Sequence, residues 1–114
     1  MAGVVSQFAR KVYDAVAEIP AGHVSTYQSV AKRIGCSCPR AVGQALRVNP
    51  FAPKVPCHRV IGSDLRLGGF QGRRAGVALR RKQELLAAEG VRFVDGRLED
   101  PGRIWHYHDF LSNS

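Results

Sequence analysis

The sequence predicts a mainly α-helical domain with a small β element, of the winged helix-turn-helix-like class. Two short amphipathic segments follow each other across a turn of about four residues, which is the spacing of a helix-turn-helix. Alternation of apolar and polar residues occurs only near the C-terminus, so strands are expected to be few. A chain of 114 residues fits one compact domain, and we expect residues 1–114 to form it alone.

The first predicted helix spans residues 6–19. Ser6 can cap its N-terminus, and the Pro-Ala-Gly segment 20–22 ends it. Its apolar residues recur at helical spacing and are Phe8, Val12, Ala15, Val16 and Ile19.

The next two predicted helices form the helix-turn-helix. After a short extended piece at 23–24, Ser25 or Thr26 can cap a helix that Gly35 ends. Pro39 can open the following helix, and Asn49-Pro50 ends it. The predicted apolar faces are Val30, Ala31 and Ile34 in the first helix and Val42, Ala45 and Leu46 in the second. Because the second helix also carries Arg40, Gln44 and Arg47, we interpret the pair as part of a DNA-binding domain.

The rest of the chain is predicted to be less regular. An irregular stretch with Pro53 and Pro56 leads to 60–61, and the glycine-rich segment 68–72 is either a flexible connection or a loop close to a ligand. A helix is expected over 76–89, with Leu79, Gln83 and Leu86 in one stripe. Val91 and Phe93 precede an Asp-Gly turn at 95–96, Leu98 is expected on a returning strand, and the aromatic tail 104–110 is expected to pack back on the domain.

The charge of the chain is concentrated in its middle. The whole sequence carries a formal +8, but residues 23–82 hold 12 basic residues and one acid, a net +11, and the flanks together carry −3. This segregation favours a polyanion such as nucleic acid, because neutralised phosphates release condensed counterions. A solvated basic face, or a ribosomal or heparin-like association, is the alternative.

Several classes of protein are disfavoured by composition. No apolar run approaches the roughly 20 residues that span a bilayer, and the N-terminus lacks the regions of a signal peptide, so we expect no membrane contact. Three cysteines, an odd number, indicate reduced thiols. To hold zinc, Cys36 and Cys38 would need further ligands, and the histidines are distant in sequence and lack the spacing of a zinc finger. Neither a metal nor a cofactor is therefore expected.

The segment around Cys57 carries the most reactive chemistry. A thiol stands beside His58 and Arg59, and cationic neighbours favour the nucleophilic thiolate. In extended backbone, adjacent side chains point to opposite faces, so a bend after Pro56 or a bridging water would have to connect Cys57 and His58. The alternative is a buried, inert cysteine followed by a surface histidine.

Four blocks of sequence together resemble a known family. They are IPAGHVSTY (19–27), RAVGQALRVNP (40–50), VPCHRVI (55–61) and EG (89–90). In this combination they are similar to the DNA-binding, active-site domain of 6-O-alkylguanine-DNA alkyltransferases, and the resemblance extends from about Phe8 to Val91.

The resemblance implies a direct DNA repair reaction and a role for each matching residue. Cys57 matches the sulfur that accepts the alkyl group, once per protein molecule, after the damaged base has been flipped out of the duplex. His58 matches the residue that takes the thiol proton through water, Glu89 the carboxylate that holds His58, and Asn49 the residue that fixes the active-site turn. The predicted DNA contacts are Tyr27, Arg40, Gln44, Arg47 and Arg59, with Arg40 as the finger that fills the duplex and Tyr27 as the residue that pushes the flanking phosphate. The predicted alkylguanine pocket comprises Leu46, Pro56, Val60, Phe70 and Gln71.

The sequence also departs from the family pattern. Full-length alkyltransferases usually carry an additional N-terminal domain, whereas this chain begins near the first helix of the active-site domain, so none is expected. The turn before Arg40 is shorter than usual, Phe70 stands where tyrosine is common, Gln71 replaces a small hydroxyl residue, and the stretch from Phe70 to Glu89 is longer.

These departures are typical of the alkyltransferase-like proteins, which support an alternative hypothesis. Those proteins are short, have a similar aromatic tail, and bind alkylated guanine without repairing it, flagging it for nucleotide excision repair. They lack the acceptor cysteine, whereas this chain keeps Cys57. We therefore predict a single-turnover methylated-DNA-protein-cysteine S-methyltransferase that acts on double-stranded DNA as a monomer, in the cytoplasm (nucleoid) or in a eukaryotic nucleus. The alternatives are a non-catalytic sensor that recruits nucleotide excision repair proteins, and a plain helix-turn-helix binder with an idle thiol.

Overall fold

The regular elements of the protein are mostly helices. The computed structural model describes residues 6–51, 54–68 and 76–107. The elements are α1 (Gln7–Ala17), β1 (Ser25–Thr26), α2 (Tyr27–Arg33), α3 (Pro39–Arg47), the 3-10 turn η1 (Cys57–Arg59), β2 (Val60–Ile61), α4 (Val77–Ala88), β3 (Phe93–Val94), β4 (Arg97–Leu98) and η2 (Pro101–Arg103). Within the described ranges, no helix has the length and apolar character needed to cross a membrane. The predicted mainly helical class with a small β element is confirmed.

Local capping explains where the first helices begin and end. The Ser6 hydroxyl accepts a hydrogen bond from the Ala9 amide at 3.0 Å, and the Thr26 hydroxyl accepts one from the Ser29 amide at 3.0 Å. Of the two predicted caps in β1, Thr26 is therefore the cap of α2, and Ser25 is not. Gly35 follows α2 with a φ of 74°, a conformation that favours glycine, and Pro39 opens α3.

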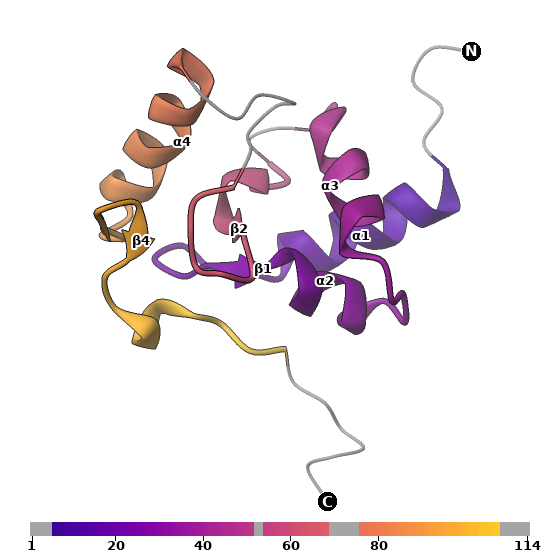
Figure 1. Cartoon of the computed structure of the whole chain (residues 1–114). Helices are drawn as coiled ribbons and strands as arrows, with labels where there is room; N and C mark the ends of the chain where they lie inside the picture. Colours follow the sequence, from indigo (N-terminus) through magenta and orange to yellow (C-terminus); the bar gives the residue numbers. More distant parts are fainter. Residues whose placement is uncertain (1–5, 52–53, 69–75, 108–114) are drawn as a thin grey trace, which may run out of the picture.

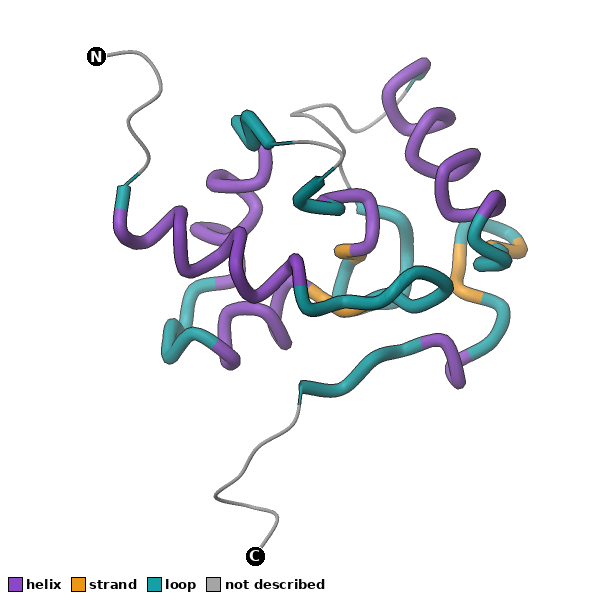
Figure 2. Tube along the Cα trace, turned by 180° about the vertical axis from the view of Figure 1, so that it is seen from behind, coloured by secondary structure: helices purple, strands orange, loops and turns teal. Residues whose placement is uncertain are grey.

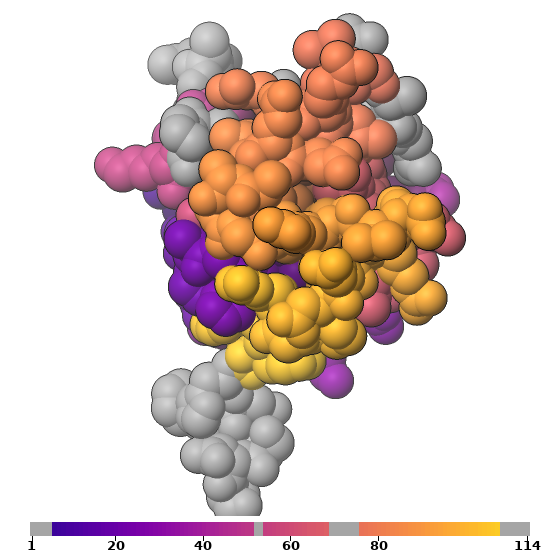
Figure 3. Space-filling view, turned by 90° about the vertical axis from the view of Figure 1, so that its left-hand side faces the viewer, coloured from indigo at the N-terminus to yellow at the C-terminus, as the bar shows by residue number. Residues whose placement is uncertain are grey.

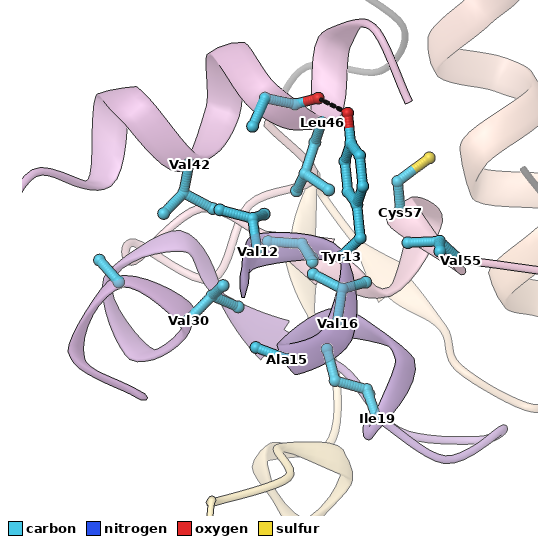
Figure 4. Packing of buried hydrophobic residues seen from close by; sticks show 13 residues of the cluster. Val12, Tyr13, Ala15, Val16, Ile19, Val30, Val42, Leu46, Val55 and Cys57 are labelled. Atoms are coloured by element: carbon cyan, nitrogen blue, oxygen red, sulfur yellow. Dashed lines mark hydrogen bonds between the residues drawn. The ribbon is translucent and has the colours of Figure 1, made fainter. Parts of the chain in front are cut away.

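Three helices surround the first hydrophobic core. α1, α2 and α3 lie together on one side of the short strands β1 and β2, and α4 lies on the other side (Figure 1). The core between these three helices contains Val12, Val16, Val30, Val42, Ala45 and Leu46, as the sequence predicted (Figure 4). Phe8 is the exception, because it lies near the helix start and remains 36% exposed. The helix-turn-helix of α2 and α3 is thus anchored by α1.

A parallel pair of strands joins the helix-turn-helix to the segment around Cys57. Ser25 of β1 pairs with Val60 of β2, and Thr26 pairs with Ile61. The sequence indicated extended backbone next to β1, at 23–24, but an irregular stretch leading to β2, and it gave no sign of their pairing, because pairing between strands so far apart in sequence depends on the tertiary fold. As a result, the residues that follow Cys57 are fixed directly against the start of α2.

A second hydrophobic cluster lies beneath α4. It contains Val24, Ile61, Leu67, Leu86, Val91 and Leu98. The predicted stripe of α4 is correct for Leu86 but wrong for Gln83, which is exposed, whereas Lys82 is fully buried. Residues 79, 82 and 86 share one helical face, so the buried stripe passes through a lysine of the basic stretch.

The predicted hairpin after α4 is present. Phe93 of β3 pairs with Leu98 of β4, and Val94 pairs with Arg97 in antiparallel register. Asp95 and Gly96 connect the strands with φ values of 53° and 80°, the positive angles that a two-residue type I′ turn requires. Through Leu98 and Phe93, the hairpin packs on the second cluster.

The described part of the C-terminal tail packs on the domain as predicted. The Val24 amide donates to Arg103 O at 2.9 Å, and the Trp105 amide donates to Val24 O at 2.7 Å, so the tail runs parallel to the chain entering β1. The Tyr107 hydroxyl donates to Ala15 O at 2.8 Å. Figure 2 shows the tail passing along the opposite edge of the molecule from α3, and Figure 3 shows that α4 and the C-terminal residues form one continuous surface.

Candidate active site

Cys57 lies in a bent segment rather than in an extended one. The Arg59 amide donates to Pro56 O at 2.9 Å, and the Cys57 amide donates to Val55 O at 2.8 Å, so the backbone folds into the 3-10 turn η1. The side chains of both Cys57 and His58 are buried, with 8% and 6% exposure. The bend that a Cys-His pair requires is therefore present, and His58 is not a surface residue.

Asn49 holds the loop that leads to Cys57. Its amide nitrogen Nδ2 donates to Val55 O at 3.0 Å, and its Oδ1 accepts from the Phe51 amide at 2.9 Å. One side chain thus ties both ends of the 49–55 loop. This geometry suits the role that the family resemblance implied for Asn49, because the loop's far end sits directly before the cysteine.

His58, Arg59 and Glu89 form one hydrogen-bonded group. The His58 Nε2 lies 3.1 Å from Glu89 Oε2. Arg59 binds the same carboxylate through two nitrogens, with Nε 3.0 Å from Oε1 and Nη2 2.7 Å from Oε2. Arg59 Nη1 also donates to Ile19 O at 2.9 Å. Although the segment between residues 70 and 89 is long, α4 returns Glu89 to the imidazole.

The Arg59 side chain is directed toward the interior of the protein. Its side chain is only 17% exposed, and its guanidinium is bound to Glu89 and Ile19 inside the protein. A bidentate contact of this kind fixes the carboxylate in the plane of the guanidinium. In the structure Arg59 thus fixes the Glu89 carboxylate, and its contact with DNA stays a prediction.

The electrostatics of this group keep His58 neutral at pH 7. Burial lowers the pKa of His58 below its ordinary value of 6.5, and the Glu89 carboxylate opposes this shift without reversing it. Burial raises the pKa of Glu89, but the hydrogen bonds from Arg59 and His58 outweigh burial and bring its pKa down from 4.5 to about 2. With Nε2–H donating to the carboxylate, Nδ1 is the nitrogen of His58 that can take a proton.

This arrangement predicts loss of stability in acid. The pKa of Glu89 is lower in the folded than in the unfolded chain, so its contribution is complete above about pH 4.5 and is lost as the pH falls toward 2. Protonation of His58 acts in the same direction, because its lowered pKa favours protonation in the unfolded chain below about pH 6.5. We expect Glu89 to contribute about 3 kcal/mol to the full loss near pH 2, of which about 2 kcal/mol is already lost at pH 3.

Urea unfolding followed between about pH 7 and pH 3 measures this loss, and the free energy of unfolding should decline steadily over that range. The exposed Asp64 serves as a control, because Asp64→Asn should leave the slope unchanged. A free energy of unfolding that stays level from pH 7 to pH 3 contradicts the prediction.

Tyr13 is a site residue that the sequence analysis missed. Its ring belongs to the same core cluster as Cys57 and Val55, and its hydroxyl donates to Ala45 O at 2.8 Å (Figure 4). Burial raises the pKa of Tyr13, and the nearby Cys57 raises it further. The sequence does carry a signal for Tyr13, which is its position beside Val12 on the buried face of α1. A tyrosine hydroxyl on that face needs a hydrogen-bond partner inside the protein.

The predicted DNA-contacting residues of α3 lie on its outer face. Arg40, Gln44 and Arg47 are all exposed, and their spacing places them on one side of the helix, opposite the buried Val42, Ala45 and Leu46. Within the described chain, the structure thus combines an exposed basic helix face with a buried thiol.

Tyr27 lies at the start of α2, close to two glycines. A Cβ added at Gly68 would lie 3.2 Å from Tyr27 Cε2, and one added at Gly43 of α3 would lie 3.8 Å from Cε1. Gly68 also has a φ of 70°. The ring is thus positioned between α3 and the 62–68 loop, where a larger residue at position 68 would collide with it.

The predicted pocket is only partly described. Leu46, Pro56 and Val60 are buried, and Leu46 and Val60 pack in the first core cluster around Cys57. Phe70 and Gln71 lie outside the described residues. The described side of the predicted pocket is therefore apolar.

The turn between α2 and α3 holds the other two thiols. Cys36 and Cys38 are free, and the Cys38 amide lies 3.3 Å from Cys36 Sγ. Cys38 occupies the N-cap of α3 without a side-chain capping bond. Among residues 6–51, 54–68 and 76–107, no group of three or more His, Cys, Asp or Glu side chains is arranged to hold a metal ion.

Comparison with known proteins matches the part of the chain that contains α3, Cys57 and Glu89. Residues 7–91 match the DNA-binding domain of 6-O-methylguanine DNA methyltransferases. The methylated-DNA–protein-cysteine methyltransferase of Methanothermobacter thermautotrophicus is 47% identical over 89 residues, which cover 78% of this chain and 47% of the relative. The chain spans about half the length of the curated relatives it matches.

Two kinds of solved structure are similar to this chain. S. pombe Atl1, in complex with damaged DNA containing O6-carboxymethylguanine, has a TM-score of 0.78 and 35% identity, covering 91% of this chain and 99% of Atl1. Mycobacterium tuberculosis OGT in complex with DNA has a TM-score of 0.67 and 39% identity, covering 75% of this chain and 51% of OGT. The first match covers almost the whole of both chains, and the second covers about half of OGT.

Proposed function

The chain belongs to the 6-O-methylguanine DNA methyltransferase family, and on this basis we propose that it transfers an alkyl group from O6 of guanine in duplex DNA to Cys57. The reaction is a single displacement. The Cys57 thiolate forms a bond to the alkyl carbon, the bond from that carbon to O6 breaks, and its electron pair leaves with the guanine. The product is a thioether with no activated bond for water to cleave, so one protein molecule accepts one alkyl group.

The observation that carries this proposal is the buried Cys57 beside a neutral histidine held by a carboxylate. His58 Nε2 is bound to Glu89, so Nδ1 is available to accept the thiol proton, directly or through water. Arg59 fixes the carboxylate from the other side. The group can therefore accept the proton of the Cys57 thiol.

The DNA side of the proposal uses the exposed face of α3. A thiol that is 8% exposed cannot reach a base that remains stacked, so the damaged nucleotide must leave the duplex before it reacts. Arg40 lies at the start of α3, and in this proposal it fills the vacated position. Flipping consumes a few kcal/mol, which contacts from Gln44, Arg47 and the basic stretch offset.

Intact mass measurement tests the proposal directly. The protein is incubated with duplex DNA that contains a single 6-O-methylguanine and, separately, with the matched undamaged duplex. We expect the mass gain of one methyl group per protein, located on the Cys57 peptide and absent from the Cys36 and Cys38 peptides. Tight binding to the damaged duplex without any gain of mass contradicts alkyl transfer.

A second candidate function has its own observation in favour. Atl1 matches this chain over 99% of its own length, so the overall architecture is that of a short protein seen on damaged DNA. In that reading the chain binds alkylguanine and recruits nucleotide excision repair proteins without chemistry. Binding of the damaged duplex without methyl transfer selects this function, whereas equal binding of both duplexes without transfer leaves only a general DNA-binding protein.

Replacement of Arg40 tests the flipping step. We expect Arg40→Ala to slow methyl transfer from duplex DNA by about 10-fold or more, because the vacated stack is no longer filled, which corresponds to 1.4 kcal/mol or more. Reaction with free 6-O-benzylguanine should change little, since a free base needs no flipping. Arg10→Ala, an exposed arginine of α1 outside the basic stretch, is the matched control.

Single-turnover rates on the two substrates give the answer. Equal loss of rate on the duplex and on the free base removes Arg40 from the flipping step.

As further parts of this proposal, the protein acts as a monomer and works where the DNA is, in the nucleoid or in a nucleus.

A further inference from the structure

Arg103 connects separate segments around Glu89, and it lies beyond the residues 7–91 that match the family. It is the last residue of η2 and is partly buried. Its Nη1 donates to Gly22 O at 3.1 Å, in the loop 18–24 between α1 and β1. The part of the chain that follows the matched residues is therefore bound to a loop within them.

The guanidinium of Arg103 also lies directly against the turn that follows α4. A Cβ added at Gly90 would lie 3.3 Å from Arg103 Nη2, and one added at Gly22 would lie 3.3 Å from Nη1. Contacts this close leave no room for a side chain at either glycine unless the guanidinium moves. Gly22 and Gly90 thus enclose the end of the Arg103 side chain.

The backbone of Arg103 is itself fixed. Its carbonyl accepts from the Val24 amide at 2.9 Å, and its amide donates to Asp100 O at 3.0 Å. The Asp100 carboxylate accepts from the Gly102 amide at 2.8 Å and caps η2. A side chain positions another group only as precisely as it is held by its own surroundings, and Arg103 meets this condition.

Glu89 requires such a support because it is the C-cap residue of α4. The last turn of a helix leaves carbonyl groups without intrahelical partners, and helix ends fray. A positive charge at this end of a helix is favourable. The Arg103 guanidinium lies against Gly90, the residue after Glu89, so it stabilises the end of α4.

Two arginines thus hold Glu89 on the loop that follows α1. Arg59 binds the Glu89 carboxylate and donates from Nη1 to Ile19 O. Arg103 lies on the turn after Glu89 and donates to Gly22 O. The Gly22 amide itself lies 3.5 Å from Glu89 Oε1. Arg59 therefore fixes the side chain of Glu89, and Arg103 fixes the backbone turn that carries it.

We propose that Arg103 is a positioning residue for His58, because it holds the end of α4 from which the Glu89 carboxylate binds His58 Nε2 at 3.1 Å. When this end of α4 moves, the carboxylate leaves the imidazole, and the proton of the neutral ring is no longer confined to Nε2. The consequence for methyl transfer rests on the proposed function. The consequence for the tautomer of His58 does not, because it concerns the protein without DNA.

The test compares the tautomer of His58 in matched variants. Arg103→Met keeps the length of the side chain but removes its donors and charge, whereas Arg103→Lys keeps a donor and the charge. Arg92→Met makes the same change at an exposed arginine shortly after Gly90 and is the control. The tautomer is read by NMR from the shifts of the two ring nitrogens in isotope-labelled protein near neutral pH, with His58→Gln to assign the signals.

We expect wild-type His58 to carry its proton on Nε2 alone, and Arg103→Met to contain a mixture of tautomers, with the two nitrogen signals closer together. Methyl transfer from duplex DNA should slow by about 10-fold in Arg103→Met. Binding of the duplex should stay unchanged, because η2 and α3 lie on different sides of the molecule (Figure 1). Arg103→Lys should stay closer to the wild type than Arg103→Met, and Arg92→Met should match the wild type.

A wild-type tautomer in Arg103→Met overturns the proposal even where transfer is slower, because Arg103 then acts only on stability. Loss of duplex binding in proportion to the loss of rate also overturns it, because the charge then acts on DNA. If Arg103→Met does not fold, Arg103→Gln takes its place, and the same two outcomes apply. If the tautomer changes as expected but wild-type protein accepts no methyl group from DNA, the proposed alkyl transfer fails while the assignment of Arg103 stands.

Discussion

Cys57→Ser is expected to abolish alkyl transfer and to leave binding of damaged DNA intact. A serine hydroxyl at neutral pH is a far weaker nucleophile than a partly ionised thiol, so the transfer rate should fall by about 10³-fold or more. The substitution changes one buried atom at a residue that is 8% exposed, so the fold should be retained. Intact mass after incubation with methylated duplex, together with a binding titration on the same duplex, measures both properties.

Cys38→Ser is the matched control for this experiment. Cys38 is exposed in the turn before α3. The Cys38→Ser variant should therefore accept a methyl group at Cys57 to the same extent as the wild type. If Cys57→Ser still gains a methyl group, another residue is the acceptor. If Cys57→Ser and the wild type are equally unmodified and bind equally well, the sensor function is the one that remains.

Glu89→Gln is expected to have the largest combined effect on stability and rate. It leaves the guanidinium of Arg59 without its carboxylate at a site where both side chains are less than a fifth exposed. Removing one partner of such a pair destabilises a protein by about 3 kcal/mol or more. The same change removes the charge that orients His58, so transfer should slow by about 10²-fold. Urea unfolding and single-turnover transfer measure the two effects.

Two further variants separate these effects. Glu84→Gln changes an exposed carboxylate of the same helix and should alter neither measurement. The double variant Arg59→Met/Glu89→Gln leaves no unpaired charge, so it should recover much of the lost stability without recovering transfer. Transfer at the wild-type rate in Glu89→Gln means that His58 works without this carboxylate.

The helices were predictable from sequence because their signals are local. Ser6, Thr26 and Pro39 mark helix starts by the chemistry of their own side chains, and Gly35 marks an end by its backbone freedom. The Asp95-Gly96 turn is local in the same sense. Pairing of β1 with β2 was not predictable, because two-residue strands carry almost no pattern and meet only when the helices pack.

The candidate site was predictable in part for the same reason. The resemblance placed Cys57, His58, Asn49 and Glu89 by their motifs, and the structure brings His58 to Glu89. Spacing could not show that Arg59 turns inward, since an arginine beside a catalytic motif in a basic stretch fits a DNA contact equally well. Lys82 fell on the buried stripe of α4, but its charge concealed that position.

By itself, therefore, the sequence determined which residues carry chemistry and which local elements hold them. Helix caps, turn residues and the motif around Cys57 act over a few positions along the chain, so their consequences can be worked out residue by residue. The tertiary structure decided which charges belong to the site. Arg59 and Lys82 look like ordinary charges of a basic stretch in sequence, and only a resemblance, not a local signal, assigned Glu89 to His58. The packing of α4 against η1 and β2 takes these three side chains largely out of water, where burial lowers the pKa of Lys82 and the hydrogen bonds from Arg59 and His58 lower the pKa of Glu89.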